Sequence, residues 1–148
     1  MRFLIITFFF FLSACDQGAD SPRGFSLPRG DADRGEQVFL SYECLSCHRL
    51  DDYNAEFPER EMEEPFVLGG QVTRVKTYAE LVTAVINPSH KISQGMQLEK
   101  MTDESGNSRM RNYNDVMTVS ELIDLVAFLE THYEPIRYPE TQYIRYYP

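Results

Sequence analysis

Two cysteines and a histidine lie close together in the sequence, within the segment Cys44-Leu45-Ser46-Cys47-His48. Two thiols three positions apart on a tight helical turn can add to the two vinyl groups of one porphyrin and form thioethers. The histidine that follows directly is then held under the iron, where it can act as an axial ligand. The spacing therefore predicts one covalently attached haem c, bound through Cys44 and Cys47, with His48 as an iron ligand.

Three other uses of the same residues have to be weighed. A thioredoxin-like redox pair is expected within a βαβ unit, and the sequence shows no such pattern. A zinc site needs four ligands, so the motif would also require His90 or His132, and no second paired motif is present. A disulfide between Cys44 and Cys47 would close a very small loop and would stabilise the fold little. Haem attachment accounts for the motif best.

A haem of this type usually takes a second axial ligand from elsewhere in the chain. Methionine sulfur and imidazole nitrogen can both serve, but a methionine more often fills a gap in the core than binds a metal. The residue type alone therefore does not select one. The candidates are His90, His132, Met62, Met96, Met101, Met110 and Met117.

Three helices are expected to position these residues, because apolar side chains recur at helical spacing in three places. The first is predicted to begin near Asp33, with Glu36 completing a capping box, and its apolar stripe runs through Val38, Phe39 and Tyr42. The second is predicted to end at Asn87, before a proline, and the third before Pro135. The capping pairs and apolar stripes of these two are Thr77, Glu80, Leu81, Val82, Val85 and Ile86, and Thr118, Glu121, Leu122, Leu125, Val126 and Leu129. No run alternates in the strand pattern, so an all-α fold is predicted.

The order of these features resembles the class I cytochrome c family over about 100 residues, from Asp33 to Tyr133. In that family a distal methionine stands on a loop and is followed by an aromatic residue and a capped final helix, as Met110 and Tyr113 are here. The resemblance implies an all-α domain around one haem, with Met110 as the second axial ligand. Arg111 stands where the family commonly has proline, which bears on the rigidity of the loop.

Other positions match the family by the same resemblance. Pro65 stands where the family uses a backbone carbonyl to accept a hydrogen bond from the proximal histidine, and such a bond orients a ligand ring. Gly35 and Phe39 match positions at which the first helix crosses the last, and Phe128 is the expected aromatic partner. A glycine at such a crossing allows two backbones to approach closely.

The N-terminus is predicted to be a signal peptide, residues 1–14. Arg2 precedes an apolar run, Phe3–Leu12, that is too short to span a bilayer, for which about 20 residues are needed. Leu12-Ser13-Ala14-Cys15 resembles the bacterial lipobox, which implies cleavage before Cys15 and lipid modification of its thiol. The alternative is an ordinary secretory signal with a chance cysteine near its cleavage site.

The mature chain divides into three parts on composition. Residues 15–31 are rich in glycine and proline and are predicted to be a flexible, lipid-anchored tether. Residues 32–134 are predicted to form the domain that resembles cytochrome c, and residues 135–148 a proline- and tyrosine-rich tail. Asp16 resembles a signal for retention at the inner membrane. The expected location is therefore the periplasmic face of the bacterial inner membrane.

Composition and charge limit the function classes. Hydrophobic residues make up 43% of the 148 residues and charged residues 25%, which argues against a wholly disordered chain. A net charge of −9 disfavours nucleic-acid binding, which needs a basic face, and favours a redox partner with a basic docking patch.

These residues predict a membrane-tethered single-electron carrier between respiratory proteins, and not an enzyme. An iron with histidine and methionine ligands has no open position for a substrate, and thioether ligation favours its reduced state. Two alternatives stay open. The chain could be the cytochrome subunit of a periplasmic dehydrogenase or oxidase. If Met110 does not bind, an open haem could instead act as a ligand sensor or a peroxidase.

Overall fold

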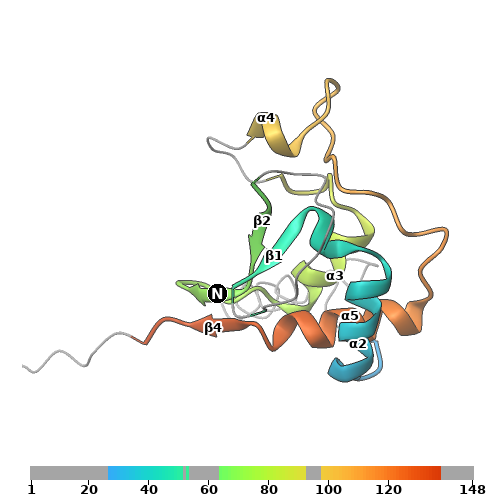
Figure 1. Cartoon of the computed structure of the whole chain (residues 1–148), viewed down its shortest axis with the longest axis vertical. Coiled ribbons are helices and arrows are strands. Elements are labelled where there is room, and N and C mark those ends of the chain that lie inside the picture. The colour runs from blue at the N-terminus through green and yellow to red at the C-terminus, as the bar shows by residue number, and fades with distance from the viewer. Residues whose placement is uncertain (1–26, 52, 54–63, 93–97, 138–148) are drawn as a thin grey trace, which may run out of the picture.

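The computed structural model describes residues 27–51, 53, 64–92 and 98–137. Within these ranges it contains four α-helices, one 3₁₀ turn and four short strands (Figure 1). In chain order they are α2 (Ala32–Ser41), η2 (Cys44–Ser46), β1 (His48–Leu50), β2 (Phe66–Leu68), β3 (Gly70–Val72), α3 (Tyr78–Ile86), α4 (Leu98–Met101), α5 (Val119–Glu130) and β4 (Tyr133–Pro135). None of the helices in these ranges has the length and apolar content needed to cross a membrane.

The prediction of an all-α fold is wrong, because the structure combines the helices with two small parallel sheets. β1 pairs with β2, and β3 pairs with β4, two strands to a sheet. Each strand has three residues, which is too few to show an alternating pattern. The paired strands lie far apart in the sequence, so no local sequence pattern predicts their pairing.

Gly69 and Gly70 allow the chain to pass from one sheet to the other. Both have a positive φ, 79° and 77°, which side chains other than glycine rarely adopt. A Cβ atom on Gly69 would also lie 2.5 Å from the backbone oxygen of His132. The two glycines therefore end the pairing of β2 with β1 and bring β3 directly against the last strand.

The helix caps agree with the sequence at two helices and differ at one. Thr77 with Glu80, and Thr118 with Glu121, form the predicted capping boxes of α3 and α5. The cap predicted at Asp33 is wrong, because α2 begins at Ala32 and the side chain of Asp31 accepts a hydrogen bond from the N–H of Arg34 at 3.0 Å. Asp33 lies within the first turn, where its negative charge favours the positive end of the helix.

The first and last of the described helices, α2 and α5, cross in direct contact (Figure 1). Gly35 is buried at the crossing, and a Cβ atom there would lie 2.0 Å from the backbone oxygen of Asp124. One turn further on, the rings of Phe39 and Phe128 lie 5.5 Å apart. The predicted crossing is therefore confirmed, with the predicted aromatic pair.

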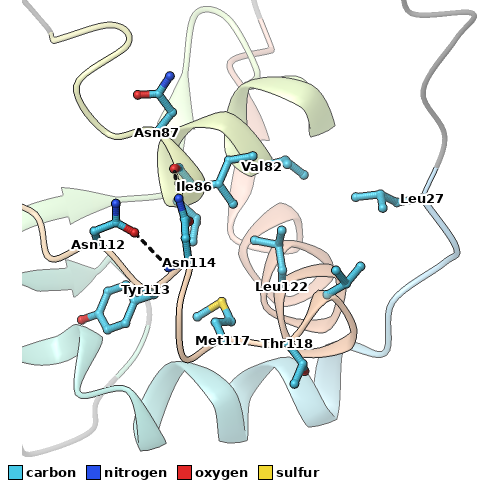
Figure 2. Close-up of a pocket in the computed structure, with 12 residues that line it drawn as sticks. Leu27, Val82, Ile86, Asn87, Asn112, Tyr113, Asn114, Met117, Thr118 and Leu122 are labelled. Carbon is cyan, nitrogen blue, oxygen red and sulfur yellow. Dashed lines mark hydrogen bonds between the residues drawn. The ribbon is translucent and has the colours of Figure 1, made fainter. Parts of the chain in front are cut away.

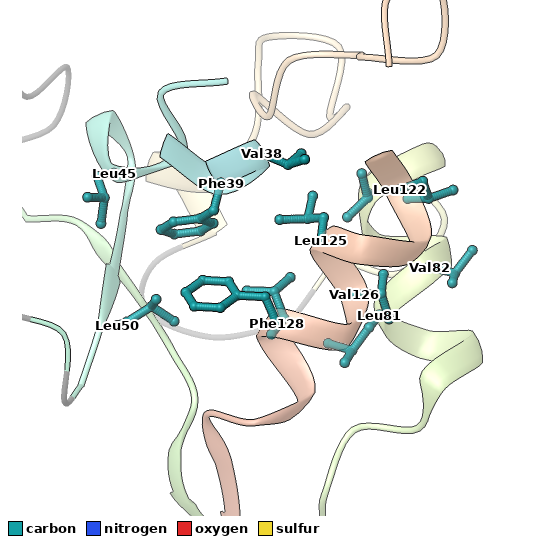
Figure 3. Close-up of a cluster of buried hydrophobic side chains, with 12 residues drawn as sticks. Val38, Phe39, Leu45, Leu50, Leu81, Val82, Leu122, Leu125, Val126 and Phe128 are labelled. Carbon is teal, nitrogen blue, oxygen red and sulfur yellow. The ribbon is translucent and has the colours of Figure 1, made fainter. Parts of the chain in front are cut away.

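The hydrophobic core extends from this crossing toward α3 on one side and the first sheet on the other (Figure 3). Its most deeply buried side chains are Phe39, Leu50 and Val126. Leu45 of η2 belongs to the same cluster, so the turn that carries the two cysteines is fixed to the core. The cluster comprises Val38, Phe39, Leu45, Leu50, Leu81, Val82, Val85, Leu122, Leu125, Val126, Phe128 and Leu129.

A buried carboxylate secures the start of α2 to α5. Asp124 accepts hydrogen bonds from the backbone N–H of Asp31 at 2.7 Å and from Nε of Arg34 at 2.8 Å. Arg34 also pairs with the side chain of Asp31 at 3.0 Å. The hydrogen bond from Arg34 is the main reason that the pKa of Asp124 is lowered.

Asp124→Asn is expected to lower the melting temperature at neutral pH by on the order of 5 °C. An amide removes the ion pair and turns one acceptor oxygen into a donor. Because the pKa of Asp124 is lowered in the fold, its contribution is complete above the ordinary carboxyl pKa and is lost as the pH falls through the lowered value. The deficit of the variant should therefore stay constant from about pH 7 to about pH 5 and shrink as the pH falls below about 4. Thermal unfolding over this range tests it, with Asp115→Asn, at an exposed position outside any helix, as control. A deficit independent of pH would contradict it.

Several features predicted from the sequence lie outside the described residues. They are the signal peptide, Cys15, the tether up to Ser26, and the tail from Tyr138 onward. The last residues predicted to belong to the tether are described, and they are part of the fold. Leu27 packs against the core, and Asp31 caps α2.

Candidate functional site

The two cysteines lie on a tight turn that follows α2. Glu43 adopts a left-handed conformation, with φ 54°, and this ends the helical direction of the chain. Backbone hydrogen bonds then close the turn, from the N–H of Ser46 to the oxygen of Glu43 at 2.9 Å and from the N–H of Cys47 to the oxygen of Cys44 at 3.3 Å. The turn thus brings the two cysteines to the compact helical geometry that the motif predicts.

Both cysteines are thiols in the structure, so the alternative of a disulfide between them is not formed. Each is half-buried. Burial raises the pKa of Cys44 to about 11, so this thiol keeps its proton at neutral pH. The hydroxyl of Ser46 lies 3.7 Å from Sγ of Cys47 and donates to it.

His48 begins β1 directly after the turn, and its ring lies 6.3 Å from that of Phe66. Nδ1 of His48 is buried and has no hydrogen-bond partner among the described residues. Burial lowers the pKa of His48, which favours the neutral imidazole that binds metals. Two thiols on one turn and a neutral, incompletely partnered imidazole next to them are a donor set that fits a covalently held haem.

Pro65 lies beside the motif through the first sheet. It directly precedes β2, in which Phe66 is the register partner of His48. The N–H of Phe66 also donates to the backbone oxygen of Cys47 at 2.9 Å. The structure thus brings Pro65 and the motif together. Nδ1, the ring nitrogen left to donate when Nε2 binds iron, has no hydrogen-bond partner among the described residues, so the predicted bond from His48 to the Pro65 carbonyl is not formed.

Tyr113 ties the segment that contains Met110 to the cysteine turn. Its hydroxyl donates to the backbone oxygen of Tyr42 at 3.3 Å, and the two rings meet edge to face with centroids 5.4 Å apart. The Tyr42 hydroxyl in turn lies 3.1 Å from the backbone oxygen of Val116 and 3.3 Å from the carboxylate of Glu121. Segments about 70 residues apart in the chain are therefore joined two residues before Cys44.

Sequence reasoning missed this role of Tyr42, which it counted only among the apolar residues of the first helix. The partners of Tyr42 come from the far end of the domain, at sequence separations of 71, 74 and 79 residues. No pattern within the first helix marks such contacts. The aromatic character of both tyrosines was the only available signal.

Met110 is half-buried and follows a short connection that is closed on itself. Thr102 and Ser108 form an antiparallel bridge, and the N–H of Arg109 donates to the backbone oxygen of Met101 at 2.8 Å. The N–H of Met110 donates to the hydroxyl of Ser108 at 3.2 Å. These bonds set where the segment of Met110 begins, and iron ligation by Met110 stays a prediction.

The other candidate ligands lie in varied surroundings. His90 is exposed. His132 is half-buried at the end of α5, with its ring 4.7 Å from Phe128 and 6.3 Å from Tyr53. Met62 and Met96 lie outside the described residues. The described part of the chain contains no cluster of three or more cysteine, histidine or acidic residues able to hold a metal ion, so it does not support the zinc alternative.

A groove of about 670 Å³ lies between the C-terminal end of α3 and the N-terminal end of α5 (Figure 2). Tyr113 forms part of its wall, so the groove adjoins the segment of Met110. The amide of Asn114 crosses to α3 and donates to the backbone oxygen of Ile86 at 2.9 Å. The lining residues are Leu27, Val82, Val85, Ile86, Asn87, Asn112, Tyr113, Asn114, Met117, Thr118, Val119 and Leu122.

Comparison with known proteins finds no relative of this chain. The chain matches no protein-family model, no curated protein and no solved structure.

Proposed function

We propose that this chain is a mono-haem c-type cytochrome that carries single electrons, tethered to the periplasmic face of the bacterial inner membrane through Cys15. The observation that carries the proposal is the compact turn bearing Cys44 and Cys47, with His48 directly after it. The resemblance of the segment from Met110 to Tyr113 to the class I cytochrome c family supports it further.

The residues of the chain have separate tasks in this proposal. The thiols of Cys44 and Cys47 hold the group covalently, and the attachment of their turn to the core through Leu45 fixes its position. His48 would supply an imidazole nitrogen to the iron, and Met110 would supply a thioether sulfur. A haem bound in this way supplies one iron that gains or loses a single electron, and methionine ligation together with apolar surroundings raises its potential.

Tyr113 is a positioning residue in this arrangement. Its hydrogen bond and ring contact with Tyr42 hold the Met110 segment beside the cysteine turn. The two sides of the site are thereby linked through the protein itself. Tyr42 is further fixed by the carboxylate of Glu121, which also caps α5.

The partners follow from charge and tether. A net charge of −9 favours a redox partner with a basic docking patch, and the encounter should weaken as the salt concentration rises. A lipid anchor at Cys15 would confine the domain near membrane-bound donors and acceptors and raise its effective concentration there.

The proposal is tested by visible spectra of the protein matured in a bacterial periplasm, oxidised and reduced, with and without carbon monoxide. A low-spin reduced spectrum, a weak far-red sulfur-to-iron band in the oxidised form and no response to carbon monoxide are the expected results. A high-spin spectrum that shifts with carbon monoxide would contradict the carrier function and favour ligand binding or catalysis.

Met110→Ala is expected to remove the far-red band and to make the reduced protein bind carbon monoxide, because the iron loses its sulfur ligand. Met117→Ala is the matched control. Met117 lines the groove and packs against the core, so its loss should leave both spectra unchanged. If Met110→Ala keeps the parent spectrum, another residue is the ligand.

A further inference from the structure

The lobe around α4, residues 98–109 (the α4 lobe), is joined to the rest of the domain without apolar packing. None of its side chains is buried, and none of its residues belongs to the core cluster. In Figure 1 α4 lies apart from the other helices. A segment with so few buried contacts opens at a small cost in free energy. The polar contacts at its edges therefore decide where it lies.

The α4 lobe meets the body of the domain through polar groups near both of its ends. On α4, Nζ of Lys100 donates to a carboxylate oxygen of Glu64 in an exposed ion pair. At the other end, the N–H of Ser108 donates to the hydroxyl of Ser89 at 3.0 Å, three residues after α3. The ion pair joins residues 36 positions apart, so it closes over the part of the chain that contains α3.

The ion pair connects the two sides of the proposed site. Glu64 lies two residues before β2, and β2 pairs with the strand that begins at His48. Lys100 lies in the lobe that directly precedes Met110. The contact of Tyr113 with the first helix holds the Met110 segment only on its C-terminal side. On its N-terminal side, the segment is held through the α4 lobe.

We propose that Lys100 and Glu64 are a positioning pair that holds the α4 lobe closed and thereby keeps Met110 at the site. This role rests on the proposed function, because that function assigns Met110 to the iron. An exposed ion pair usually contributes little to overall stability, since water and salt screen it. Here it acts on a lobe that no apolar packing holds, so its loss changes the opening of that lobe directly.

Backbone hydrogen exchange of the full mature chain, followed by NMR, tests the pair. Glu64→Lys and Lys100→Glu should each raise the exchange rate of the Ser108 N–H about fivefold, because repulsion replaces attraction at the ion pair. The chain with both substitutions has the pair reversed and should return to the parent rate. Glu104→Lys, at an exposed position of the same lobe, is the matched control. It changes the net charge as Glu64→Lys does and should leave the rate unchanged.

The N–H of Asn107 separates movement of the whole lobe from melting of the lobe. It donates to the carboxylate of Asp103 at 2.9 Å, and both residues lie inside the lobe. Its exchange rate should therefore be the same in all the chains. A rise in parallel with the Ser108 N–H would mean that the substitutions unfold the lobe, which would overturn the proposal.

A second measurement follows Met110 itself. Saturating imidazole replaces a thioether ligand of the oxidised iron at the rate at which Met110 leaves it. This rate should rise about fivefold in each single variant and return to the parent value in the double variant.

Two further results would overturn the proposal. One is equal exchange of the Ser108 N–H in all the chains. The other is faster exchange without faster imidazole binding, because the pair would then hold the lobe and not Met110. Absence of haem from every chain would instead refute the proposed function, and the exchange rates would still decide whether the pair holds the lobe.

Discussion

Replacing Cys44 and Cys47 together with alanine is expected to yield a chain without covalent haem. In the proposed attachment, each thiol supplies one of the two thioethers. The turn offers no substitute, because the side chain of Leu45 has no nucleophilic atom and the hydroxyl of Ser46 is buried and far less nucleophilic than a thiol. Because Leu45 of the same turn belongs to the core, loss of the haem should also lower the yield of folded protein. Haem staining after denaturing electrophoresis measures the covalent fraction.

The controls separate attachment from anchoring. Cys15→Ser should lose the lipid and keep the haem, whereas each single variant, Cys44→Ala or Cys47→Ala, should keep one thioether and part of the stain. Covalent haem retained in the double variant would refute the assignment of the site. Loss of the stain in Cys15→Ser with normal export would show that the N-terminal cysteine has a different role.

Replacing Gly35 with alanine is expected to separate α2 from α5. The added Cβ would lie 2.0 Å from the backbone oxygen of Asp124 and 2.7 Å from Cβ of Phe128. The first of these contacts is with backbone, which cannot rotate away, so the helices must move apart along the whole crossing. We expect a loss of about 3 kcal/mol of unfolding free energy, although alanine in place of glycine inside a helix is otherwise worth about 1 kcal/mol in the opposite direction.

The two effects have opposite signs, so the direction of the change in unfolding free energy shows whether the helices are in close contact. Gln37→Ala, at an exposed position two residues further along α2, is the matched control and should change stability little. Denaturant unfolding of the parent and the two variants gives both values. A Gly35→Ala protein as stable as its parent would mean that the two helices do not approach as closely as the structure has them.

The helices could be predicted from the sequence because their signals are local. Two capping boxes and the apolar stripes that follow them lie within single turns, and the structure has them where they were expected. The start of α2 was misplaced by two residues, because Asp31 and Asp33 are both suitable caps and the choice depends on Asp124, 93 residues away. The crossing partner of Gly35 came from the family resemblance and not from any periodicity.

The sheets and the contacts around the site could not be predicted, because they join segments that lie far apart in the sequence. His48 pairs with Phe66 and Gly70 pairs with Tyr133, and three-residue strands bring no pattern of their own. The motif itself could be recognised in the sequence, because the predicted chemistry depends only on two cysteines three positions apart and a histidine directly after them. The position of Pro65 followed from resemblance, whereas the bond between Tyr42 and Tyr113 requires the folded chain.

The contact between α2 and α5 also determines how late in biosynthesis the domain can fold. Phe39 cannot reach Phe128 until the far helix has been made and lies on the same side of the membrane, and translation of the roughly 90 intervening residues alone takes about 5 to 20 s. Through that interval the Cys44 thiol lacks the burial that raises its pKa in the finished fold. If haem is attached as proposed, the unfinished chain presents both thiols before the domain closes, and a haem-attaching enzyme would find its substrate there rather than in the folded protein.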